Sequence, residues 1–305
     1  MSKCDLCTKR RAEVYLKYAG LKLCPECFIQ FFRRRIQKII EEYKMFKKNE
    51  KIGVAISGGK DSSSLLHTLK NIYPKQEFTA FHINLGITGY SDHCEEKARE
   101  LARQLDVELV IYNLKNREGY TIEDFERTKY SRKMCSTCGV IKRHVMNVMA
   151  CEANVDVLAT GHNLDDTVET MFSTFISGDF KQLIRLKPVL PSIHPKLKKK
   201  VKPLIKIPEV ENLLYASYNN LPIRRVNCRY SESARSIRRK RLINKISDSD
   251  QKFKYQLLSV FLKKLIPMVE KEKEKVKLVE CKLCGYPSLR EICSKCVRTQ
   301  VLLGT

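Results

Sequence analysis

The chain is short of acidic residues and of long apolar runs. Its 305 residues hold 34 Asp and Glu against 58 Lys and Arg, a formal net charge of +24 at pH 7. No apolar run approaches the roughly 18 residues that span a bilayer, and the opening MSKCDLC has no apolar signal region. These absences argue against a membrane protein and predict a cytoplasmic one. With 43% hydrophobic residues, the chain can still bury a sizeable core.

The excess of positive charge predicts a polyanionic partner, because each neutralised phosphate releases counterions. The charge is gathered at 195–203 (PKLKKKVKP) and at 224–245, where nine basic residues face the single acid Glu232. In the second segment a helix could pack an apolar side and present guanidinium groups outward. That side would consist of Ile237, Leu242 and Ile243. Because so sparse an apolar face suits a membrane surface poorly, RNA is the favoured partner.

A Walker phosphate loop is also missing, although the stretch VAISGGKDSSSLL at 54–66 has a glycine turn. The pattern instead predicts a strand at 51–56, a turn, and a helix from Ser62. Gly58 and Gly59 would let the backbone approach a ligand closely, and the helix start would direct free N–H groups at an anion. Lys60 suits phosphate oxygens, and Asp61 suits a magnesium ion held against them. The turn from Ser57 to Ser62 is therefore predicted to bind phosphate.

Strand and helix patterns alternate after a linking helix at 29–46. Strands are predicted at 51–56, 78–85, 107–114 and 155–160, and helices around 62–70, 92–105 and 139–153. This alternation predicts a parallel sheet covered by helices, with ligands at the carboxyl ends of the strands. FHINLGI at 81–87, which includes His82, ends the second strand and could contact adenine through its backbone. ATGHNLDDTVET ends the last strand and carries Gly161, His162, Asp165 and Asp166 into a helix; Asp165 could be only a charge at the helix start.

Thirteen cysteines in a cytoplasmic chain indicate metal binding rather than disulfides. Eight of them form two quartets of CxxC pairs, Cys4, Cys7, Cys24 and Cys27 near the start and Cys281, Cys284, Cys293 and Cys296 near the end. Each quartet can complete a closed tetrahedron of thiolates, as in a structural zinc site. In the second quartet the loop that connects the two CxxC pairs is shorter, so an iron site is less firmly excluded there.

Three further cysteines are candidates for sulfur chemistry. Cys135 and Cys138 form MCSTCG at the start of a predicted helix, whose dipole is expected to lower the thiol pKa values. Cys228 stands alone beside the arginines. Three thiolates could hold three irons of a four-iron cluster and leave one iron open. The same residues could equally form a redox pair that carries a persulfide. Cys94 and Cys151 receive no role from the sequence.

SGGKDS at 57–62 resembles the pyrophosphate-binding loop of the ATP pyrophosphatases. Together with TGHNLDD, CSTC, the distant Cys228 and the two quartets, it makes nearly the whole chain similar to the two-thiouridine synthetases of the TtuA and NcsA type. The resemblance implies a homodimer, an ATP site at 57–62 and a [4Fe-4S] cluster on the three cysteines. It also implies catalytic assistance from a lysine and an aspartate, which match Lys142 and Asp166 by motif position.

The combined prediction is an α/β protein with a Rossmann-like, PP-loop parallel sheet of the adenine nucleotide alpha hydrolase kind, flanked by helices. Its expected parts are a zinc ribbon at 1–30, the catalytic domain at 31–245, a helical linker at 246–275 and a zinc ribbon at 276–305. ATP, Mg²⁺, two zinc ions and the cluster are its expected cofactors.

The expected function is tRNA 2-thiolation, in which uridine O2 is adenylated and then replaced by sulfur without net redox change. The wobble uridine is favoured, with a T-loop uridine as the alternative. The predicted catalytic residues are Asp166, Lys142, Lys60 and Asp61; the nucleotide site comprises Ser57, Gly58, Gly59, Lys60, Asp61, Ser62, His82 and Gly161. Free sulfide and a sulfur-carrier protein both remain open as donors. A persulfide route, a small-molecule ATP pyrophosphatase and a non-catalytic zinc RNA-binding protein are the other functions that the residues allow.

Overall fold

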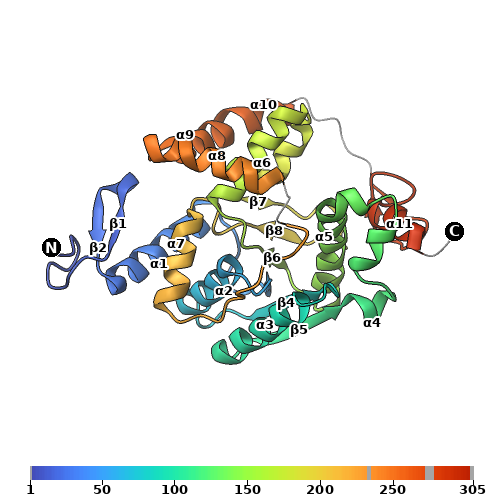
Figure 1. Cartoon of the computed structure of the whole chain (residues 1–305), viewed down its shortest axis with the longest axis horizontal. Helices are drawn as coiled ribbons and strands as arrows, with labels where there is room; N and C mark the ends of the chain where they lie inside the picture. Colours follow the sequence, from blue (N-terminus) through green and yellow to red (C-terminus); the bar gives the residue numbers. More distant parts are fainter. Residues whose placement is uncertain (1, 232–234, 272–277, 303–305) are drawn as a thin grey trace.

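A six-stranded sheet lies at the centre of the chain, in the computed structural model shown in Figure 1. The structure describes residues 2–231, 235–271 and 278–302. The strand order is β5-β4-β3-β6-β8-β7. The strands are β3 (Ile52–Ala55), β4 (Phe78–Asn84), β5 (Glu108–Asn113), β6 (Val157–Ala159), β7 (Val189–Leu190) and β8 (Lys199–Val201).

Apolar residues on alternating positions of the strands explain why helices cover both faces of the sheet. On β4, Phe78 and Ala80 belong to one core cluster, whereas Phe81 and Ile83 belong to the other. The first cluster includes side chains of α1 (Pro25–Glu42), α2 (Lys60–Ile72), α3 (Ser91–Leu105), α6 (Leu164–Ser177) and α7 (Glu209–Tyr218). The second includes those of α5 (Met134–Glu152). The predicted α/β architecture is therefore confirmed.

The order of the strands creates a change of direction between β3 and β6. From β3 the chain adds β4 and then β5 on one side, and it returns to place β6 on the other. The pairs β3/β4, β4/β5, β3/β6 and β6/β8 are parallel. When the connections that follow two adjacent parallel strands run in opposite directions, a crevice opens at the carboxyl ends of these strands. Ligands bind in this crevice in such folds. The loops after β3 and β6 flank this point.

Two short strands extend the sheet beyond what the sequence patterns predict. β8 is parallel to β6, but β7 pairs antiparallel with β8 and forms the edge. Several boundaries also differ: α1 begins and ends four residues earlier than the linking helix predicted at 29–46, and α5 begins at Met134 rather than near 139. The predicted parallel sheet thus has one antiparallel edge strand.

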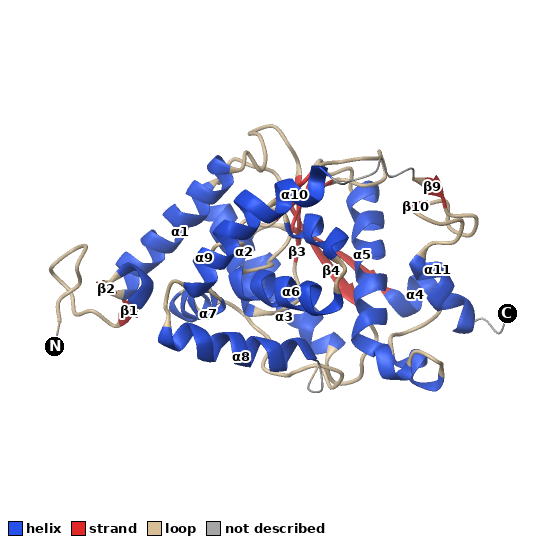
Figure 2. Ribbon diagram, turned by 90° about the horizontal axis from the view of Figure 1, so that it is seen from above, coloured by secondary structure: helices blue, strands red, loops and turns tan. Residues whose placement is uncertain are grey.

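Small units lie at the two ends of the molecule, as Figures 1 and 2 show. The hairpin of β1 (Val14–Leu16) and β2 (Leu21–Leu23) precedes α1 at the N-terminal end. At the other end, β9 (Val279–Glu280) and β10 (Pro287–Ser288) pair before α11 (Ser294–Thr299), which packs on α5. α4 (Leu114–Glu118) follows β5. None of the described helices is long and apolar enough to cross a membrane.

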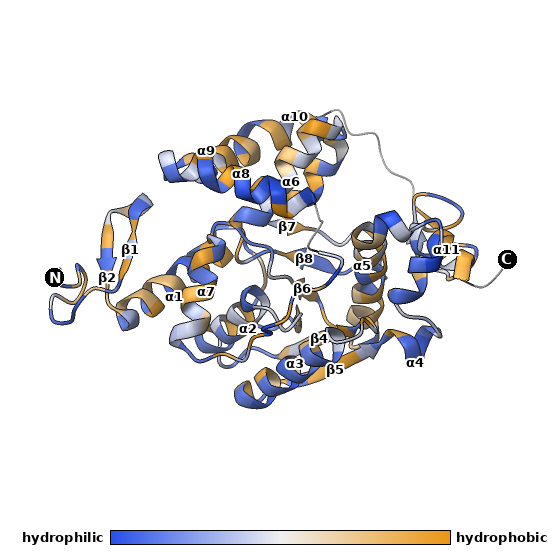
Figure 3. Ribbon diagram, in the orientation of Figure 1, coloured by the Kyte–Doolittle hydropathy of each residue, from blue (hydrophilic) through white to orange (hydrophobic). Residues whose placement is uncertain are grey.

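A helical layer packs on α6 and contains the basic segment. It consists of α8 (Arg235–Ser249), α9 (Phe253–Val260), a turn of π-helix at Phe261–Leu265, and α10 (Ile266–Lys271). Figure 3 colours most of α8 as hydrophilic. The expected apolar side of this helix is only partly correct: Ile243 is 2% exposed, but Leu242 is 60% exposed. Glu232 lies outside the described residues.

Candidate functional site

The loop between β3 and α2 has the backbone shape that phosphate binding requires. Gly58 has φ +68°, a conformation that side-chain-bearing residues rarely adopt. A Cβ at this position would lie 2.7 Å from the carbonyl oxygen of Cys94 in α3, so the loop and α3 touch here. Lys60 is the first residue of α2, and the N–H groups of this helix start are available to an anion. Ser62 Oγ closes the turn by accepting from the N–H of Ser57 at 3.1 Å.

Arg224 approaches this loop from far along the chain. Its N–H donates to the carbonyl of Gly58 at 2.7 Å. Its guanidinium lies over the ring of Tyr90, at 5.4 Å from the centroid, and Nη1 would be 2.6 Å from a Cβ at Gly59. Sequence reasoning assigned Arg224 only to the basic segment, so its place beside the phosphate loop is new. The guanidinium adds a second cation where phosphate oxygens are expected.

Lys60 and Asp61 both belong to a network of charges and amides. Lys60 Nζ pairs with Asp61 at 3.2 Å and with Glu209 of α7 at 2.6 Å. Asp61 Oδ1 accepts from the amides of Asn163 at 3.0 Å and Asn212 at 2.8 Å. Burial raises the pKa of Asp61, although Lys60 opposes this. Burial would lower the pKa of Lys60, but Asp61 and Glu209 outweigh it and raise the pKa. The two residues therefore form a cation and a carboxylate at the mouth of the loop.

The loop after β6 packs directly against the phosphate loop. A Cβ at Gly161 would lie 3.1 Å from the backbone nitrogen of Ser62, so glycine permits this contact. Asn163 then caps α6: its side chain accepts from the N–H of Asp166 at 2.9 Å, and its own N–H donates to Asp166 at 3.3 Å. His162 contacts the hydroxyl of Thr160 at 2.8 Å. This capping box fixes Asp166 at the start of α6, close to Asp61 and its partner Asn163.

Asp165 also has a structural role at this helix start. Its two oxygens accept from the N–H of Glu209 at 2.7 Å and from Lys254 of α9 at 2.5 Å. Asp165 thus joins α6 to α7 and α9. From the sequence it could have been only a charge at the start of a helix.

His82 lies beneath the loop rather than at its surface. The residue is 2% exposed, and Nδ1 is 3.0 Å from the carbonyl oxygen of Ile56. Burial lowers the pKa of its imidazole. A contact with adenine would have to come from the backbone at the end of β4, as predicted, because the ring itself supports the end of β3.

The three predicted sulfur-site cysteines come together from two distant segments. Cys135 and Cys138 lie in the first turns of α5. Cys135 Sγ is 3.1 Å from the carbonyl oxygen of Tyr230, two residues beyond Cys228. Arg229 and Tyr230 are themselves held by Glu126, at 2.8 Å and 2.6 Å. The chain around Cys228 is therefore fastened beside the start of α5.

The position of Cys135 and Cys138 at the start of α5 does not lower the pKa values of their thiols. Partial burial raises the pKa of Cys135, and the neighbouring Cys138 and Cys228 thiols raise it further. Burial raises the pKa of Cys138, and the adjacent Lys142, one turn along α5, opposes this. The expectation of lowered thiol pKa values is therefore wrong for Cys135 and Cys138, because burial and repulsion between the thiolates raise both values. Lys142 does lie beside the site as predicted.

One short segment joins the phosphate loop to the cysteines. Ser63 in α2 hydrogen-bonds the carbonyl of Pro222 at 3.5 Å, and Arg224 follows over the loop. Arg225 stands three residues before Cys228, and its N–H donates to Nε2 of His93 in α3 at 3.3 Å. Buried Cys94, 3% exposed, feels the charges of both Arg224 and Cys228; burial first raises its pKa, and Arg224 opposes this. The two predicted sites are thus neighbours.

Three cations that lie close to one another, one of them next to Cys138, have no carboxylate within 4.0 Å among the described residues. They are Arg143 of α5, Arg185 before β7, and Lys200 of β8. Burial lowers the pKa of Lys200 to about 8, and Arg143 and Arg185 contribute. The chain that follows Arg185 is held in place from the end of β8, since Lys202 Nζ donates to the carbonyl of Lys187 at 2.9 Å. An unbalanced group of this kind suits an anionic ligand such as phosphate.

Both cysteine quartets have the dimensions of a four-thiolate metal site. Within each quartet the Sγ atoms all lie within 4.8 Å of one another. Cys7 and Cys24 are 3.9 Å apart, and Cys284 and Cys293 are 3.7 Å apart. Tetrahedral zinc with Zn–S bonds of about 2.3 Å needs sulfurs about 3.8 Å apart. Backbone N–H groups outweigh burial and lower the pKa of Cys4 and of Cys281 to about 6. The residues present therefore fit zinc.

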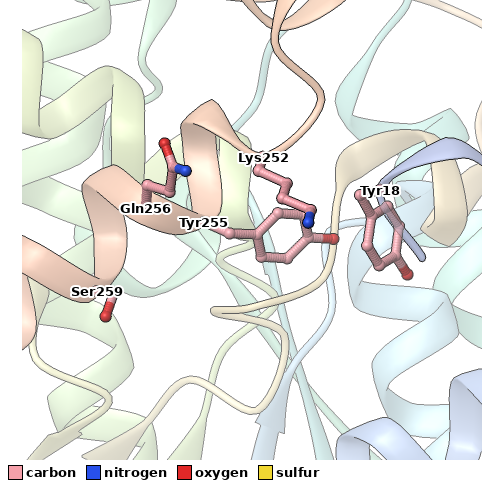
Figure 4. A pocket seen from close by; sticks show the side chains of 5 residues that line it. All are labelled: Tyr18, Lys252, Tyr255, Gln256 and Ser259. Atoms are coloured by element: carbon pink, nitrogen blue, oxygen red, sulfur yellow. The ribbon is translucent and has the colours of Figure 1, made fainter. Parts of the chain in front are cut away.

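An open pocket of about 330 Å³ lies elsewhere, between the N-terminal unit and α9. Figure 4 shows the five side chains that line it, Tyr18, Lys252, Tyr255, Gln256 and Ser259. It contains none of the predicted site residues, so the candidate site remains at the carboxyl ends of β3 and β6.

Comparison with known proteins agrees with this geometry. The family model described as a PP-loop domain matches residues 29–246, and that of the 2-thiouridine synthetase TtuA N-terminal LIM domain matches residues 3–29. The chain belongs to the PP-loop family, and within it to the TtuA/NcsA type. The predicted resemblance is confirmed.

Relatives of this PP-loop protein extend over almost its whole length. The tRNA-5-methyluridine(54) 2-sulfurtransferase of Pyrococcus horikoshii is 35% identical over 96% of this chain and 92% of its own. That of Thermotoga maritima is 36% identical over 98% and 97%. A solved structure, the U34-tRNA thiolase NcsA from Methanococcus maripaludis with its [4Fe-4S] cluster, has a TM-score of 0.82 and 30% identity, covering 99% of this chain and 97% of that one.

Proposed function

We propose that this PP-loop protein is an ATP-dependent tRNA sulfurtransferase that replaces O2 of a uridine with sulfur. The observation that carries the proposal is the segment from Pro222 to Cys228. It crosses the phosphate loop at Gly58 and ends at the three-cysteine site. A site for ATP and a site for sulfur thus lie side by side, as a reaction that activates an oxygen and then replaces it requires. The names of the relatives support tRNA as the substrate.

The first chemical step would be adenylation. Uracil O2 is a poor leaving group, so its lone pair attacks the α-phosphorus of ATP, an O2–P bond forms, and the bond to pyrophosphate breaks. Pyrophosphate carries away the electron pair of that bond. Lys60, Arg224 and the N–H groups at the start of α2 would stabilise its charge, and Asp61 would hold Mg²⁺ against the phosphates.

The second step would exchange oxygen for sulfur. Sulfide attacks C2, the C2–O2 bond breaks, and AMP leaves with the oxygen and the electron pair. No atom is oxidised or reduced overall. Asp166, fixed at the start of α6, would orient the uridine or take its proton; Lys142, beside Cys138, would stabilise the negative charge that develops.

The three cysteines fit a cluster better than a single ion. Among the described residues the only groups of three or more ligands within 4.8 Å are the two quartets, so Cys135, Cys138 and Cys228 are spread more widely than one ion needs. Three thiols around a wider space suit three corners of a [4Fe-4S] cluster. When bound, such a cluster would supply an open iron that delivers sulfide. The same residues as a persulfide carrier remain the alternative.

The target uridine lies at one of two positions in tRNA. The sequence favoured the wobble position, and the structural relative at 30% identity is a U34-tRNA thiolase. The relatives at 35% and 36% identity are named for 5-methyluridine 54. Because they share more of the sequence, we favour the T-loop position, with the wobble position as the alternative. Either base would have to leave its loop to reach the phosphate loop and the cysteines.

The remaining assignments complete the proposal. Each cysteine quartet holds one zinc ion and stiffens a terminal unit that grips tRNA. The chain acts in the cytoplasm as a homodimer, with free sulfide or a carrier protein as its sulfur donor. Its parts are the two ribbons at 1–30 and 276–305, the catalytic domain at 31–245 and the helical linker at 246–275; the boundary near 275 lies outside the described residues.

Nucleoside mass spectrometry tests the proposal directly. Transfer RNA from cells that lack the gene should have lost a 2-thiouridine nucleoside, and digestion into fragments should place the loss in the T-loop. Loss from the anticodon instead would identify the wobble position. An unchanged set of thiolated nucleosides would contradict the proposed function.

A further inference from the structure

Two consecutive basic residues fasten α8 to acidic residues at the start of α6. Arg239 pairs with Glu169 at 2.6 Å, and Lys240 pairs with Asp166 at 2.5 Å. Their side chains are similarly exposed, 26% and 24%. The inward contact of Arg239 differs from the expectation that this helix presents its guanidinium groups outward. The two ion pairs also make these residues a natural comparison, because within the described part of the chain only Lys240 pairs with a second carboxylate.

That second partner is Glu209, the first residue of α7. Glu209 Oε2 is 3.1 Å from Lys240, and its other oxygen, Oε1, is 2.6 Å from Lys60. A continuous row of alternating charges therefore runs Asp166, Lys240, Glu209, Lys60, Asp61. We call Glu209 and Lys240 the charge bridge. It links a predicted catalytic carboxylate to the lysine of the phosphate loop.

The central carboxylate is strongly ionised. Burial alone would raise the pKa of Glu209, but Lys240 and Lys60 outweigh it and lower the pKa to about 2. Burial would likewise lower the pKa of Lys240, but Asp166 and Glu209 raise it. Glu209, Lys240 and Lys60 are thus charged near neutral pH, and Glu209 is shared between the two lysines. The positive charge of Lys240 offsets part of the attraction between Glu209 and Lys60, so removing that charge would strengthen the hold of Glu209 on Lys60.

We propose that Glu209 and Lys240 are positioning residues that set how readily Lys60 can turn to the phosphates of ATP. Glu209 holds Lys60 toward α7, and Lys240 limits this hold by taking part of the same carboxylate. The inference deepens the proposed function, on which it rests for the identity of the ATP site. It assigns to α8 a contribution to the ATP site in addition to any contact with RNA.

The charges predict opposite effects for the two residues. Glu209→Gln removes a negative charge from beside the phosphate site and releases Lys60, so ATP should bind about two- to fivefold more tightly. Lys240→Gln leaves Glu209 to Lys60 alone, so ATP should bind more weakly by a similar factor. The double variant should return toward the wild-type affinity. Arg239→Gln, the adjacent control, should leave the dissociation constant for ATP unchanged.

The experiment is calorimetric titration of the full-length protein and the four variants with a non-hydrolysable ATP analogue and Mg²⁺, without tRNA. Thermal unfolding measured on the same samples shows whether each variant is folded. Opposite shifts that cancel in the double variant support the proposal. Shifts of the same sign, no shift, or an equal shift in Arg239→Gln would overturn it.

A second readout separates this inference from the proposed function. Both bridge variants should lower kcat for thiolation, because Lys60 and Asp166 lose their fixed positions, while Arg239→Gln should not lower it to the same degree. If the variants show the expected shifts in affinity for the analogue but the wild-type protein never thiolates tRNA, the proposed function is wrong and the inference about the charge bridge holds. If wild-type protein binds no nucleotide, both fail.

Discussion

The N–H of Arg224 donates a 2.7 Å hydrogen bond to the carbonyl of Gly58, and this contact joins the basic segment to the phosphate loop. The two residues are far apart in sequence, yet the contact places the arginine side chain over Gly59. The loop is thus shaped both by its own glycines and by a segment that continues to Cys228. The predicted ATP site and the predicted sulfur site are brought together by this one crossing of the chain.

This contact predicts different outcomes for the two glycines. Gly58→Ala should destabilise the fold by about 1–2 kcal/mol or more, because φ is +68° and the new methyl group would meet the backbone of Cys94. Gly59→Ala should cost less stability, since the atom it meets is the movable end of Arg224. Both should weaken ATP binding. Urea unfolding and nucleotide titration measure the two effects, and equal loss of stability in both variants would contradict the account.

Lys60→Ala and Asp61→Ala should each lower ATP-dependent thiolation by about 100-fold or more, because they remove the cation and the magnesium ligand from the developing pyrophosphate. Neither should change the zinc content, since the quartets lie at the ends of the molecule. Single-turnover thiolation and elemental analysis measure these outcomes. Normal turnover in either variant would refute the assignment of the loop.

Zinc should be present at about two ions per chain, one for each quartet. Cys4→Ser and Cys284→Ser should each lose about one ion and reduce stability or tRNA binding more than ATP binding. Cys151→Ser is the control, because this half-buried thiol of α5 belongs to neither quartet and donates to the carbonyl of Lys196. Purified, unstripped protein without zinc would count against both sites.

Much of the fold could be predicted because its signals are local. The strands at β3 to β6 are apolar runs that end in turns, and each was expected close to its observed position. β7 and β8 were missed because two or three residues such as Lys199–Val201 carry no recognisable period. The phosphate loop and the quartets were found because their residues are close in sequence.

The missing part of the site depends on tertiary contacts. Glu209 reaches Lys60, Asn212 reaches Asp61 and Lys240 reaches Glu209 only because α7 and α8 pack near the carboxyl ends of the strands. In the sequence, Glu209 is an ordinary acid after a proline, and Lys240 is one basic residue in a run. Only distances between distant elements distinguish Lys240 from Arg239. The prediction of lowered thiol pKa values was wrong for the same reason, because the CxxC spacing does not show how deeply the thiols are buried.

The lowered pKa of Lys200 leads us to predict that tRNA binding depends on pH. Its pKa is lowered to about 8 by burial and by Arg143 and Arg185, so its charge is largely present at pH 7 and largely lost at pH 9. Lys202 next to it has a pKa lowered by burial to about 7 and loses its charge over an overlapping range. If a tRNA phosphate binds this group, affinity should fall as pH rises from 7 to 9. Lys200→Arg should flatten the fall, as fluorescence anisotropy with labelled tRNA can show; an unchanged profile would contradict this contact.

The central claim is that Cys135, Cys138 and Cys228 deliver sulfur to a uridine activated at the neighbouring ATP loop. The most direct test is thiolation of unmodified tRNA with ATP, Mg²⁺ and sulfide under anaerobic conditions, with iron measured in the same samples. We predict about four irons per chain, loss of both iron and activity on alanine substitution of any of the three cysteines, and retention of both in Cys151→Ala. Full thiolation by iron-free protein would contradict the cluster, and full thiolation by all three single variants would contradict the site itself.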